Sequence, residues 1–507
     1  MSASACSDFL DQQPLSEVNA GNFFRSKIEV DASMSGLYSA FQMQMNGDGQ
    51  YLERYNFWGD YRSDNFERFF NYTTTTTTEL HFNTITADNP FADWTGMYNV
   101  ISRANNNIKY IPEVAKIDAT LTPAIANQYL AESYALRAIS YFYIVRVWGD
   151  APIWTEPYPV EDLNTDPSRP REASAKIINE VIIKDLESAY GLITKNQTPV
   201  VWNMSEGAIC AMMADVYMWN KDYPNAIIWI NRLFAAKAPT GAAYAGTSDA
   251  NLEPTATWKN IFTSPAASRE AIWSLHWNYT DNGCACLEIS YTPNNKQIRV
   301  DPDLFTKYFL PATTTAATGD IRPKQTLDLY TVANRANNNR DRFVKWYQSP
   351  VNPTATTTTA QLNTYFTQNH PVYLPMYRLG DIYLLYAEAL NGDNNLPGAL
   401  RYLNYIRKRA GLPEYVAANP AVSTKAAMEN TILQERQYEL IGEGKRWFDL
   451  VRTGKVKEIM DPVLKRRQAE AGSEQLGFAD NRRVYWPVSR SVLNSNKKLV
   501  QNPGYTD

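Results

Sequence analysis

The chain is poor in the residues on which most catalytic and metal sites depend. Its 507 residues include four Cys and three His, and the three histidines are far apart in the sequence. The chain contains no GxSxG, HExxH or phosphate-binding glycine motif. Cys284 and Cys286 form a CxC pair, but no second Cys/His pair lies nearby, as a zinc site would require. These absences argue against an enzyme of the common nucleophilic or zinc-dependent types.

Strong charge and long apolar runs are missing as well. The net charge is −4, which argues against nucleic acid as a partner. Charged residues make up only 20%, so the chain is not a disordered acidic one. No run of 18 apolar residues exists that could form a membrane-spanning helix.

Aromatic residues, by contrast, are abundant. They make up 13% of the chain, with 32 Tyr and 13 Trp. Two interpretations stay open: a densely packed aromatic core, or surfaces on which sugar rings stack.

The strongest helical pattern lies in the stretch Ala131–Pro157. Apolar residues recur there at helical spacing from Tyr134 to Trp148, on one face. Gly149 can adopt the left-handed conformation that ends a helix, and Pro152 prevents its continuation. We therefore expect a core helix, and its place in a stack of repeated helix pairs, described next, further implies that it touches no ligand.

Further helical patterns occur on both sides of this stretch. Two of the helix pairs resemble each other: a helix ending in Asn, a short polar turn and a second helix opening on Ala226 or Ala399. Such pairs resemble degenerate tetratricopeptide units, which must stack because one pair cannot bury its own apolar face. The predicted helices are Phe91–Ile111, Thr122–Val147, Glu172–Leu192, Ser205–Trp219, Asn225–Ala235, Met376–Leu390, Gly398–Ala410 and Thr424–Arg452.

Two regions lack a helical period. Residues 51–89 combine aromatic and charged residues with six consecutive Thr, which predicts a long aromatic loop, either a core plug or a binding surface. Residues 239–375 are rich in Gly, Pro, Thr and Asn and predict an irregular insertion.

The clearest strand candidate in this insertion is Ala271–Tyr279. On a strand, Trp273, Leu275, Trp277 and Tyr279 would share one face, which is either buried or available to a ligand.

The sequence thus predicts a mostly α fold. We expect a tetratricopeptide-like superhelix with a large loop-rich insertion containing short strands. The predicted parts are a tether over 1–20, a helical scaffold over 21–238 that carries the aromatic loop 51–89, the insertion over 239–375, and a second scaffold segment with the C-terminal tail over 376–507.

Cys6 follows a short run of small residues. This is the pattern of a bacterial lipoprotein after removal of its leader, although an incidental exposed Cys would look the same. Too few residues precede Cys6 for a signal-peptide apolar core.

Four stretches, spread along the chain in order, resemble the SusD/RagB family of nutrient-binding outer-membrane lipoproteins. They are CSDFLDQQP (6–14), ALRAISYFYIVRVWGDAPIWTEP (135–157), the pair RLGDIYLLYAEALN (378–391) and LQERQYELIGEGKRWFDLVRTG (433–454), and YWPVSRSVLNSNKKLVQNPGY (485–505).

The resemblance implies a surface protein anchored through lipidated Cys6 on the extracellular face of the outer membrane. It also implies a partner, a SusC-like TonB-dependent transporter over which the lipoprotein acts as lid and receptor. Most relatives bind glycans and some are thought to bind peptides. We therefore expect a glycan receptor without enzymatic activity; the alternative is a RagB-like peptide receptor.

Glycan binding without catalysis needs flat apolar faces with polar groups at their edges. Because the variable loops do not align by motif, the family lends no binding residues. The candidates come from the aromatic loop, the strand and the insertion: Trp58, Asp64, Phe66, Phe69, Tyr72, Trp277, Tyr279 and Trp346.

Acidic residues suggest two further possibilities. Glu435, Glu439 and Glu443 lie on one helical face, where an ion-paired face is a more common explanation than the paired carboxylates of a polysaccharide hydrolase. Asp301, Asp303 and Asp320 could help to hold a structural Ca²⁺, which some relatives carry, although their spacing is loose. No other cofactor is expected.

Overall fold

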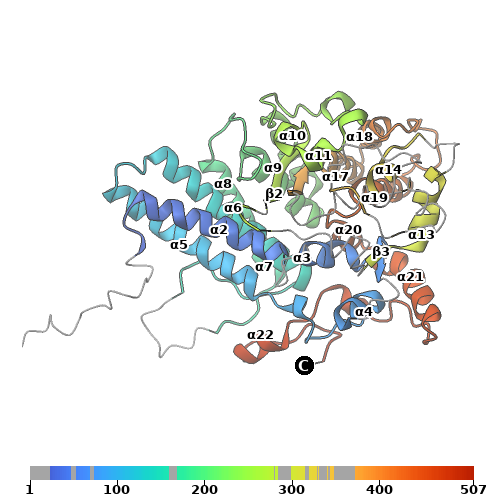
Figure 1. Ribbon diagram of the computed structural model, residues 1–507, viewed down its shortest axis with the longest axis horizontal. Coiled ribbons are helices and arrows are strands. Elements are labelled where there is room, and N and C mark those ends of the chain that lie inside the picture. Colours follow the sequence, from blue (N-terminus) through green and yellow to red (C-terminus); the bar gives the residue numbers. More distant parts are fainter. Residues whose placement is uncertain are drawn as a thin grey trace, which may run out of the picture.

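The computed structural model describes residues 23–46, 53–68, 74–158, 168–278, 280–283, 298–313, 319–327, 329, 340, 343–346 and 371–506. Three long helices, α2 (Lys27–Asn46), α5 (Thr95–Ile117) and α6 (Pro123–Trp148), run alongside one another at one end of the molecule (Figure 1). Helices α18 (Leu396–Arg409), α19 (Lys425–Leu440) and α21 (Val456–Glu470) lie towards the other end (Figure 1).

Helix α6 is the centre of the helical core, as its sequence pattern predicts. Thr122 caps its first turn, Pro123 occupies the first helical position, and Gly149 takes a positive φ of 80° directly after its end. From Ala131 to Trp148 every residue except Tyr134 is buried. The apolar face predicted by the spacing is thus only part of the buried surface, because neighbours cover this half of the helix on nearly all sides.

The remaining scaffold helices pack in sequence order, each against the next. Helix α6 contacts α8 (Ile183–Leu192), α8 contacts α9 (Glu206–Trp219), and α9 contacts α10 (Tyr223–Ala235). Helix α10 then contacts α17 (Leu379–Gly392), although more than 100 residues separate them in the chain. Helix α17 in turn contacts α18 (Leu396–Arg409) and α19 (Lys425–Leu440). This serial packing confirms the predicted tetratricopeptide-like superhelix.

The two helix pairs recognised as repeats share the chemistry of their turns. Lys221 and Asn394 take left-handed backbone conformations, with φ of 58° and 64°. Each precedes an Asx cap, Asp222 or Asn395, whose side chain accepts from the backbone three residues later. Pro in the first turn follows in both. The resemblance between the pairs is therefore structural as well as sequential.

Two short antiparallel sheets join the insertion to the scaffold. Strand β2 (Ala271–Trp277) pairs with β4 (Val372–Arg378), and β1 (Phe66–Arg68) pairs with β3 (Ile298–Val300). The strand predicted at Ala271–Tyr279 is confirmed over Ala271–Trp277. Strand β4 was not predicted, and it occupies the beginning of the predicted helix Met376–Leu390.

The other described elements are short or lie near the two sheets and the C-terminus. The α-helices are α3 (Glu53–Asn56), α4 (Thr75–Phe82), α7 (Ser174–Ile177), α11 (Asn260–Thr263), α13 (Pro302–Leu304), α14 (Arg322–Thr326), α20 (Arg446–Thr453), α21 (Val456–Glu470) and α22 (Arg490–Ser495). The π-helical turns are η2 (Phe57–Tyr61), η4 (Ile178–Ile182) and η8 (Phe305–Phe309). The 3₁₀ turns are η3 (Pro90–Ala92), η5 (Asp249–Asn251), η6 (Thr255–Thr257), η7 (Pro265–Ala267), η9 (Leu310–Thr313) and η10 (Asn481–Val484).

Three predictions about elements are wrong. Residues 51–89 are not one long loop, because their described part forms α3, η2, β1 and α4, and Thr74 caps the helix that the Thr run enters. Helix α5 continues through Pro112 to Ile117. The predicted helix Thr424–Arg452 is two helices, since Gly442 and Gly444 between them have positive φ values of 83° and 66°.

A network of buried ion pairs surrounds the end of α19. Both carboxylate oxygens of Glu439, whose side chain is 0% exposed, are paired: Arg378 lies 2.7 Å from one and Arg322 3.1 Å from the other. Arg409 also pairs with Glu439, and Arg378 and Lys345 both pair with Glu443. All three carboxylates, Glu435, Glu439 and Glu443, are therefore ion-paired, as expected, and buried rather than solvated. They do not share one helical face, because α19 ends at Leu440 and Glu443 lies beyond it.

These ion pairs connect the insertion to the scaffold. Arg322, Lys345 and Glu270 belong to the insertion, whereas Arg409 ends α18 and Glu439 belongs to α19. Burial alone would raise the pKa of Glu439, but the neighbouring arginines outweigh it and hold this pKa well below its usual range. The Glu439 carboxylate is consequently charged. This buried charge is stable only while all of its partners are present.

His81 on α4 is another buried titratable group, and unlike Glu439 it carries no charge. Its Nδ1 accepts a hydrogen bond from the backbone N–H of Arg68 at 3.4 Å. Burial, together with the positive charges of Arg467 and Arg68, lowers its pKa to about 2. The imidazole is therefore neutral in the folded state at ordinary pH.

Among the described helices, none has both the length and the apolar character needed to cross a membrane. Cys210, predicted to be a small core residue, is buried and free, and burial raises the pKa of its thiol.

We predict that Glu439→Gln lowers the free energy of unfolding by about 3–5 kcal/mol, because it leaves buried arginines without their charge partner. Denaturant unfolding measures the loss. The matched control is Glu113→Gln, which breaks an exposed pair with Lys116 and should cost at most about 0.5 kcal/mol. Equal effects of the two substitutions would contradict the role assigned to the network.

We predict that His81 makes the fold sensitive to acid. The unfolded histidine titrates near pH 6.5, whereas the folded one resists protonation down to about pH 2. Stability is therefore complete above about pH 6.5 and falls by up to about 1.4 kcal/mol for each pH unit below it. His81→Gln should keep up to about 2 kcal/mol that the wild type loses between about pH 7.5 and pH 5. The free energy of unfolding of both proteins is measured by denaturation at the two pH values. Equal losses in wild type and His81→Gln would refute this role of His81.

Candidate functional site

Four of the aromatic residues predicted to bind ligand lie in the core. The exposed fractions of Trp58, Phe66 and Trp346 are 1% each, and that of Trp277 is 3%. The indole N–H of Trp58 donates to the backbone carbonyl of Phe91 at 3.0 Å. These side chains have no free face for a sugar ring, so the expectation that they form an exposed stacking surface is wrong. Trp273, whose strand face was expected to be either buried or available to a ligand, is also buried.

The other predicted site residues divide into two groups. The carboxylate of Asp64 accepts two hydrogen bonds from Arg446, at 2.8 and 2.9 Å, and one from Gln437 at 2.9 Å. Asp64 thus joins the aromatic segment to α19 and α20. Phe69, Tyr72, Tyr279 and Cys6 lie outside the described residues, and the roles given to them stay predictions.

The acidic residues considered as Ca²⁺ ligands are paired with arginine. Asp301 pairs with Arg466 and Arg467 at 2.6 and 2.9 Å, Asp303 with Arg466 at 3.0 Å, and Asp320 with Arg322 at 2.8 Å. In the part of the chain that the structure describes, no group of three or more His, Cys, Asp or Glu is placed to hold a metal ion.

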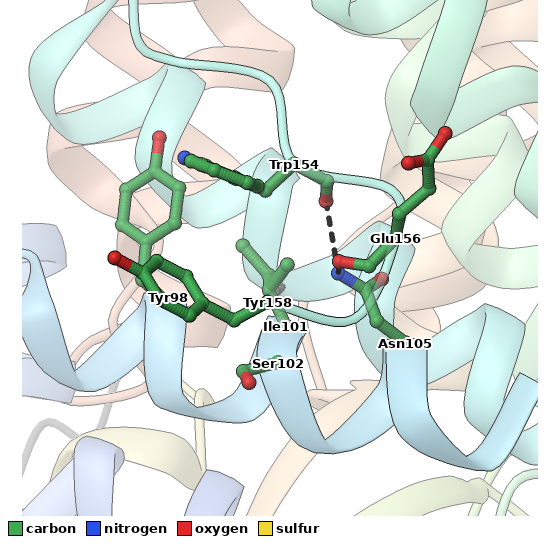
Figure 2. Close-up of a pocket in the computed structure, with 7 residues that line it drawn as sticks. All are labelled: Tyr98, Ile101, Ser102, Asn105, Trp154, Glu156 and Tyr158. Carbon is green, nitrogen blue, oxygen red and sulfur yellow. Dashed lines mark hydrogen bonds between the residues drawn. The ribbon is translucent and has the colours of Figure 1, made fainter. Parts of the chain in front are cut away.

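The structure instead places an aromatic pocket of about 200 Å³ on the outer side of α5. Figure 2 shows the rings of Tyr98, Trp154 and Tyr158 on one side of this pocket and Asn105 and Glu156 on the other. Tyr98, Ile101, Ser102 and Asn105 project from α5 at helical spacing, so they share one face. The remaining lining residues come from the segment that follows the end of α6.

Side chains of the scaffold hold this segment in place through its backbone. The five consecutive carbonyls from Pro152 to Glu156 all accept a hydrogen bond from a side chain. The donors are Tyr98 to Pro152, Arg169 to Ile153, Asn105 and Tyr141 to Trp154, Arg137 to Thr155, and Asn105 to Glu156. A segment with every carbonyl satisfied is preorganised, so binding there orders little additional backbone.

The ring of Trp154 is fixed by its neighbours. The Arg169 guanidinium carbon lies 3.7 Å from the ring centroid, and the Tyr158 ring lies 5.8 Å away at an interplanar angle of 34°. Tyr158 is 53% exposed and Trp154 is partly exposed. The pocket therefore has an apolar wall that is rigid at Trp154 and open to solvent at Tyr158.

The polar side of the pocket rests on a buried ion pair. Asn105 Oδ1 accepts a hydrogen bond from Arg137 at 2.7 Å, and Arg137 in turn donates to both carboxylate oxygens of Asp185 at 2.7 and 2.8 Å. Burial lowers the pKa of Arg137, but Asp185 outweighs it and the pKa is raised. Burial raises the pKa of Tyr98, which stays a neutral donor. Asn105 is thereby fixed in one orientation.

This arrangement suits recognition rather than reaction. Flat apolar rings with the exposed Glu156 carboxylate at their edge match a sugar ring, which has apolar C–H faces and polar hydroxyls around its rim. Sites for drug-sized ligands span roughly 300–1,000 Å³, so this smaller pocket would take one sugar ring or the end of a chain.

Our reading of the sequence missed this pocket. Trp154 and Glu156 belong to the stretch Ala131–Pro157, which we expected to touch no ligand. The available signal was the position of Trp154, Glu156 and Tyr158 directly after a helix end at Gly149 and Pro152, where loop side chains reach the surface.

Comparisons with known proteins agree for the N-terminal and C-terminal parts of the chain. A profile described as "SusD family" matches residues 269–505, and one described as "Starch-binding associating with outer membrane" matches residues 8–218. The chain belongs to the SusD-like family. SusD-like protein P38 of Formosa agariphila is 26% identical over an alignment that covers 99% of this chain and 96% of the relative.

Solved structures of the family share this fold. A laminarin-binding SusD-like protein superposes with a TM-score of 0.70 at 22% identity, covering 95% of this chain and all of the other. A SusD superfamily protein of Bacteroides thetaiotaomicron superposes with a TM-score of 0.69, also at 22% identity, covering 95% and 99% of the two chains. The tetratricopeptide-like fold predicted for this SusD-like protein is thus confirmed.

We predict that Asn105→Ala loosens the pocket wall. The substitution removes the donor to two carbonyls and a partner of buried Arg137, so the free energy of unfolding should fall by about 1–3 kcal/mol. Hydrogen exchange should show weaker protection of the Trp154 amide, which donates to Tyr141 at 2.6 Å. Ser102→Ala, on the same face of α5, is the matched control. Unchanged exchange in Asn105→Ala would show that Asn105 does not order this segment.

Proposed function

We propose that this SusD-like protein is a cell-surface receptor that captures oligo- or polysaccharide without cleaving it and delivers it to a SusC-like TonB-dependent transporter. The observation that carries the proposal is the preorganised aromatic pocket formed by Tyr98, Trp154 and Tyr158, with Asn105 and Glu156 at its edge. The laminarin-binding SusD-like structure supports the ligand class, because it has the same fold.

The membrane location forms part of the same proposal. Lipidation of Cys6 would anchor the protein to the extracellular face of the outer membrane, and residues 1–20 would act as the tether. The family description that associates matched chains with the outer membrane supports this. Labelling with a radioactive fatty acid in a bacterial host, given the gene with its export signal, tests it: Cys6→Ser should abolish incorporation.

We predict that Trp154→Ala weakens glycan binding by about 1–3 kcal/mol, as removal of a central stacking ring does. Calorimetry with laminarin and with amylopectin measures the change, with the fold checked by circular dichroism. The control is Val416→Ala, which shortens a side chain that is 69% exposed and does not line the pocket. Equal affinity of Trp154→Ala and wild type would exclude the pocket as the binding site.

Two other results would replace the proposed function. Release of reducing sugar during incubation with the polysaccharides would identify a hydrolase. Binding of peptides, with no affinity for any glycan in a broad panel, would identify a RagB-like peptide receptor.

A further inference from the structure

Three partly exposed rings, from β2, from β4 and from the turn at Trp202, stack together, and none of them lines the Trp154 pocket. His276 is the one residue of β2 that is not buried, and the register pairs it with Tyr373 on β4. The two rings are nearly parallel, at an interplanar angle of 12° with centroids 5.8 Å apart. The indole of Trp202 stacks on both, with its centroid 4.8 Å from His276 and 5.3 Å from Tyr373. We name these three residues the aromatic shelf.

The aromatic shelf is held by several elements. The turn that carries Trp202 is joined to β2, because the Ser274 N–H donates to the Val201 carbonyl at 3.0 Å. The His276 carbonyl accepts from the side-chain amide of Gln42 on α2 at 2.6 Å. The rings are thus fixed by α2, by the Trp202 turn and by the paired strands. A fixed flat surface loses little conformational entropy when a ligand stacks on it.

Polar groups border the aromatic shelf at the end of β2. Asn282 donates to the His276 carbonyl at 2.9 Å and accepts from the Asn278 N–H at 2.7 Å, so Asn282 lies close to His276. Asp281 and Asn282 are exposed. The Asp281 carboxylate accepts from the Asn278 side chain at 2.7 Å, and among the described residues no hydrogen-bond donor occupies its other oxygen.

The chemistry of the shelf and its border is that of carbohydrate recognition. Burial lowers the pKa of His276, and Asp281 opposes this only in part, so the ring is neutral at neutral pH. Three neutral rings offer an apolar surface to the C–H face of a sugar, while a carboxylate and an amide can bind its hydroxyls. An apolar protein partner would leave the second oxygen of the exposed Asp281 carboxylate without a hydrogen bond, which disfavours that alternative.

We propose that Trp202, His276 and Tyr373, with Asp281 and Asn282, form a second sugar-binding site of this protein. A pyranose ring stacks on the exposed part of the aromatic shelf, and Asp281 accepts hydrogen bonds from its hydroxyls. The inference rests on the proposed function as a glycan receptor and adds a site separate from the Trp154 pocket. A long glycan that reached both sites would bind more tightly than a short one.

The test uses affinity electrophoresis of the full chain in gels that contain laminarin or amylopectin. Relative to wild type, Trp202→Ala should weaken binding to the retarding polysaccharide at least tenfold, and Trp202→Phe less, because a flat ring remains. Asp281→Asn keeps the size of an exposed side chain and should weaken binding severalfold without affecting the fold. In the double variant Trp154→Ala/Trp202→Ala, the affinity should fall by the product of the two single factors, as expected for substitutions at separate sites.

The outcomes separate the two proposals. No retardation of wild type by any glycan in a broad panel would overturn the proposed function and this inference with it. Retardation that Trp154→Ala abolishes, and that Trp202→Ala and Asp281→Asn leave unchanged, would overturn the second site alone. Circular dichroism identifies a folding defect of Trp202→Ala. If that variant misfolds, Asp281→Asn still tests the second site, because its substitution lies on the surface.

Discussion

The fold depends on the charge balance around the carboxylates of α19. Buried charges are stable only when opposite charges and hydrogen bonds surround them, and a single lost partner leaves a costly isolated ion. Glu439 receives arginines from three separate places in the chain: Arg322 in the insertion, Arg378 at the end of β4, and Arg409 at the end of α18. Segments distant in sequence are thereby required to meet at one point, with one geometry.

This requirement extends to the surfaces that we assign to ligand. Glu270 directly precedes β2, and its side chain contacts Arg378, which ends β4, as well as the Gly380 N–H at the start of α17. The sheet that carries the aromatic shelf is therefore tied to the scaffold through the ion network. A Cβ at Gly380 would lie 2.5 Å from the Arg378 guanidinium and 2.9 Å from Glu270, so no side chain fits at this position where the charges converge. A rigid interior of this kind allows exposed rings to keep fixed positions.

The helical scaffold could be predicted from the sequence because its signals are local. Periodicity located α6, α9, α10, α17 and α18 within a few residues, and the paired turns at Lys221 and Asn394 marked the repeat. Long-range pairing could not be read in this way. Strand β4 forms only by pairing with β2. The role of Arg378 likewise depends on Glu439, which is distant in the sequence and forms an ion pair with it. The break between α19 and α20 likewise depends on the left-handed Gly442 and Gly444, whose neighbours, Phe343 and Tyr55, come from distant parts of the chain.

The candidate sites were the least predictable part, for a reason that lies in the aromatic composition itself. A chain with this much Trp and Tyr buries most of its largest rings, so a Trp in an irregular segment is a weak signal of a ligand surface. The sequence identified β2 as a strand, but both of its faces are covered as far as Trp277. Only His276, on the face opposite to Trp277, reaches solvent. The partly exposed rings of Trp154 and Trp202 and the exposed ring of Tyr158 lie instead on segments after a helix end or before a helix start. Carbonyls of these segments accept hydrogen bonds from scaffold side chains or from β2. Recognition in this SusD-like protein is thus expected at the margins of the helical stack, where backbone restraint and an open ring face coincide.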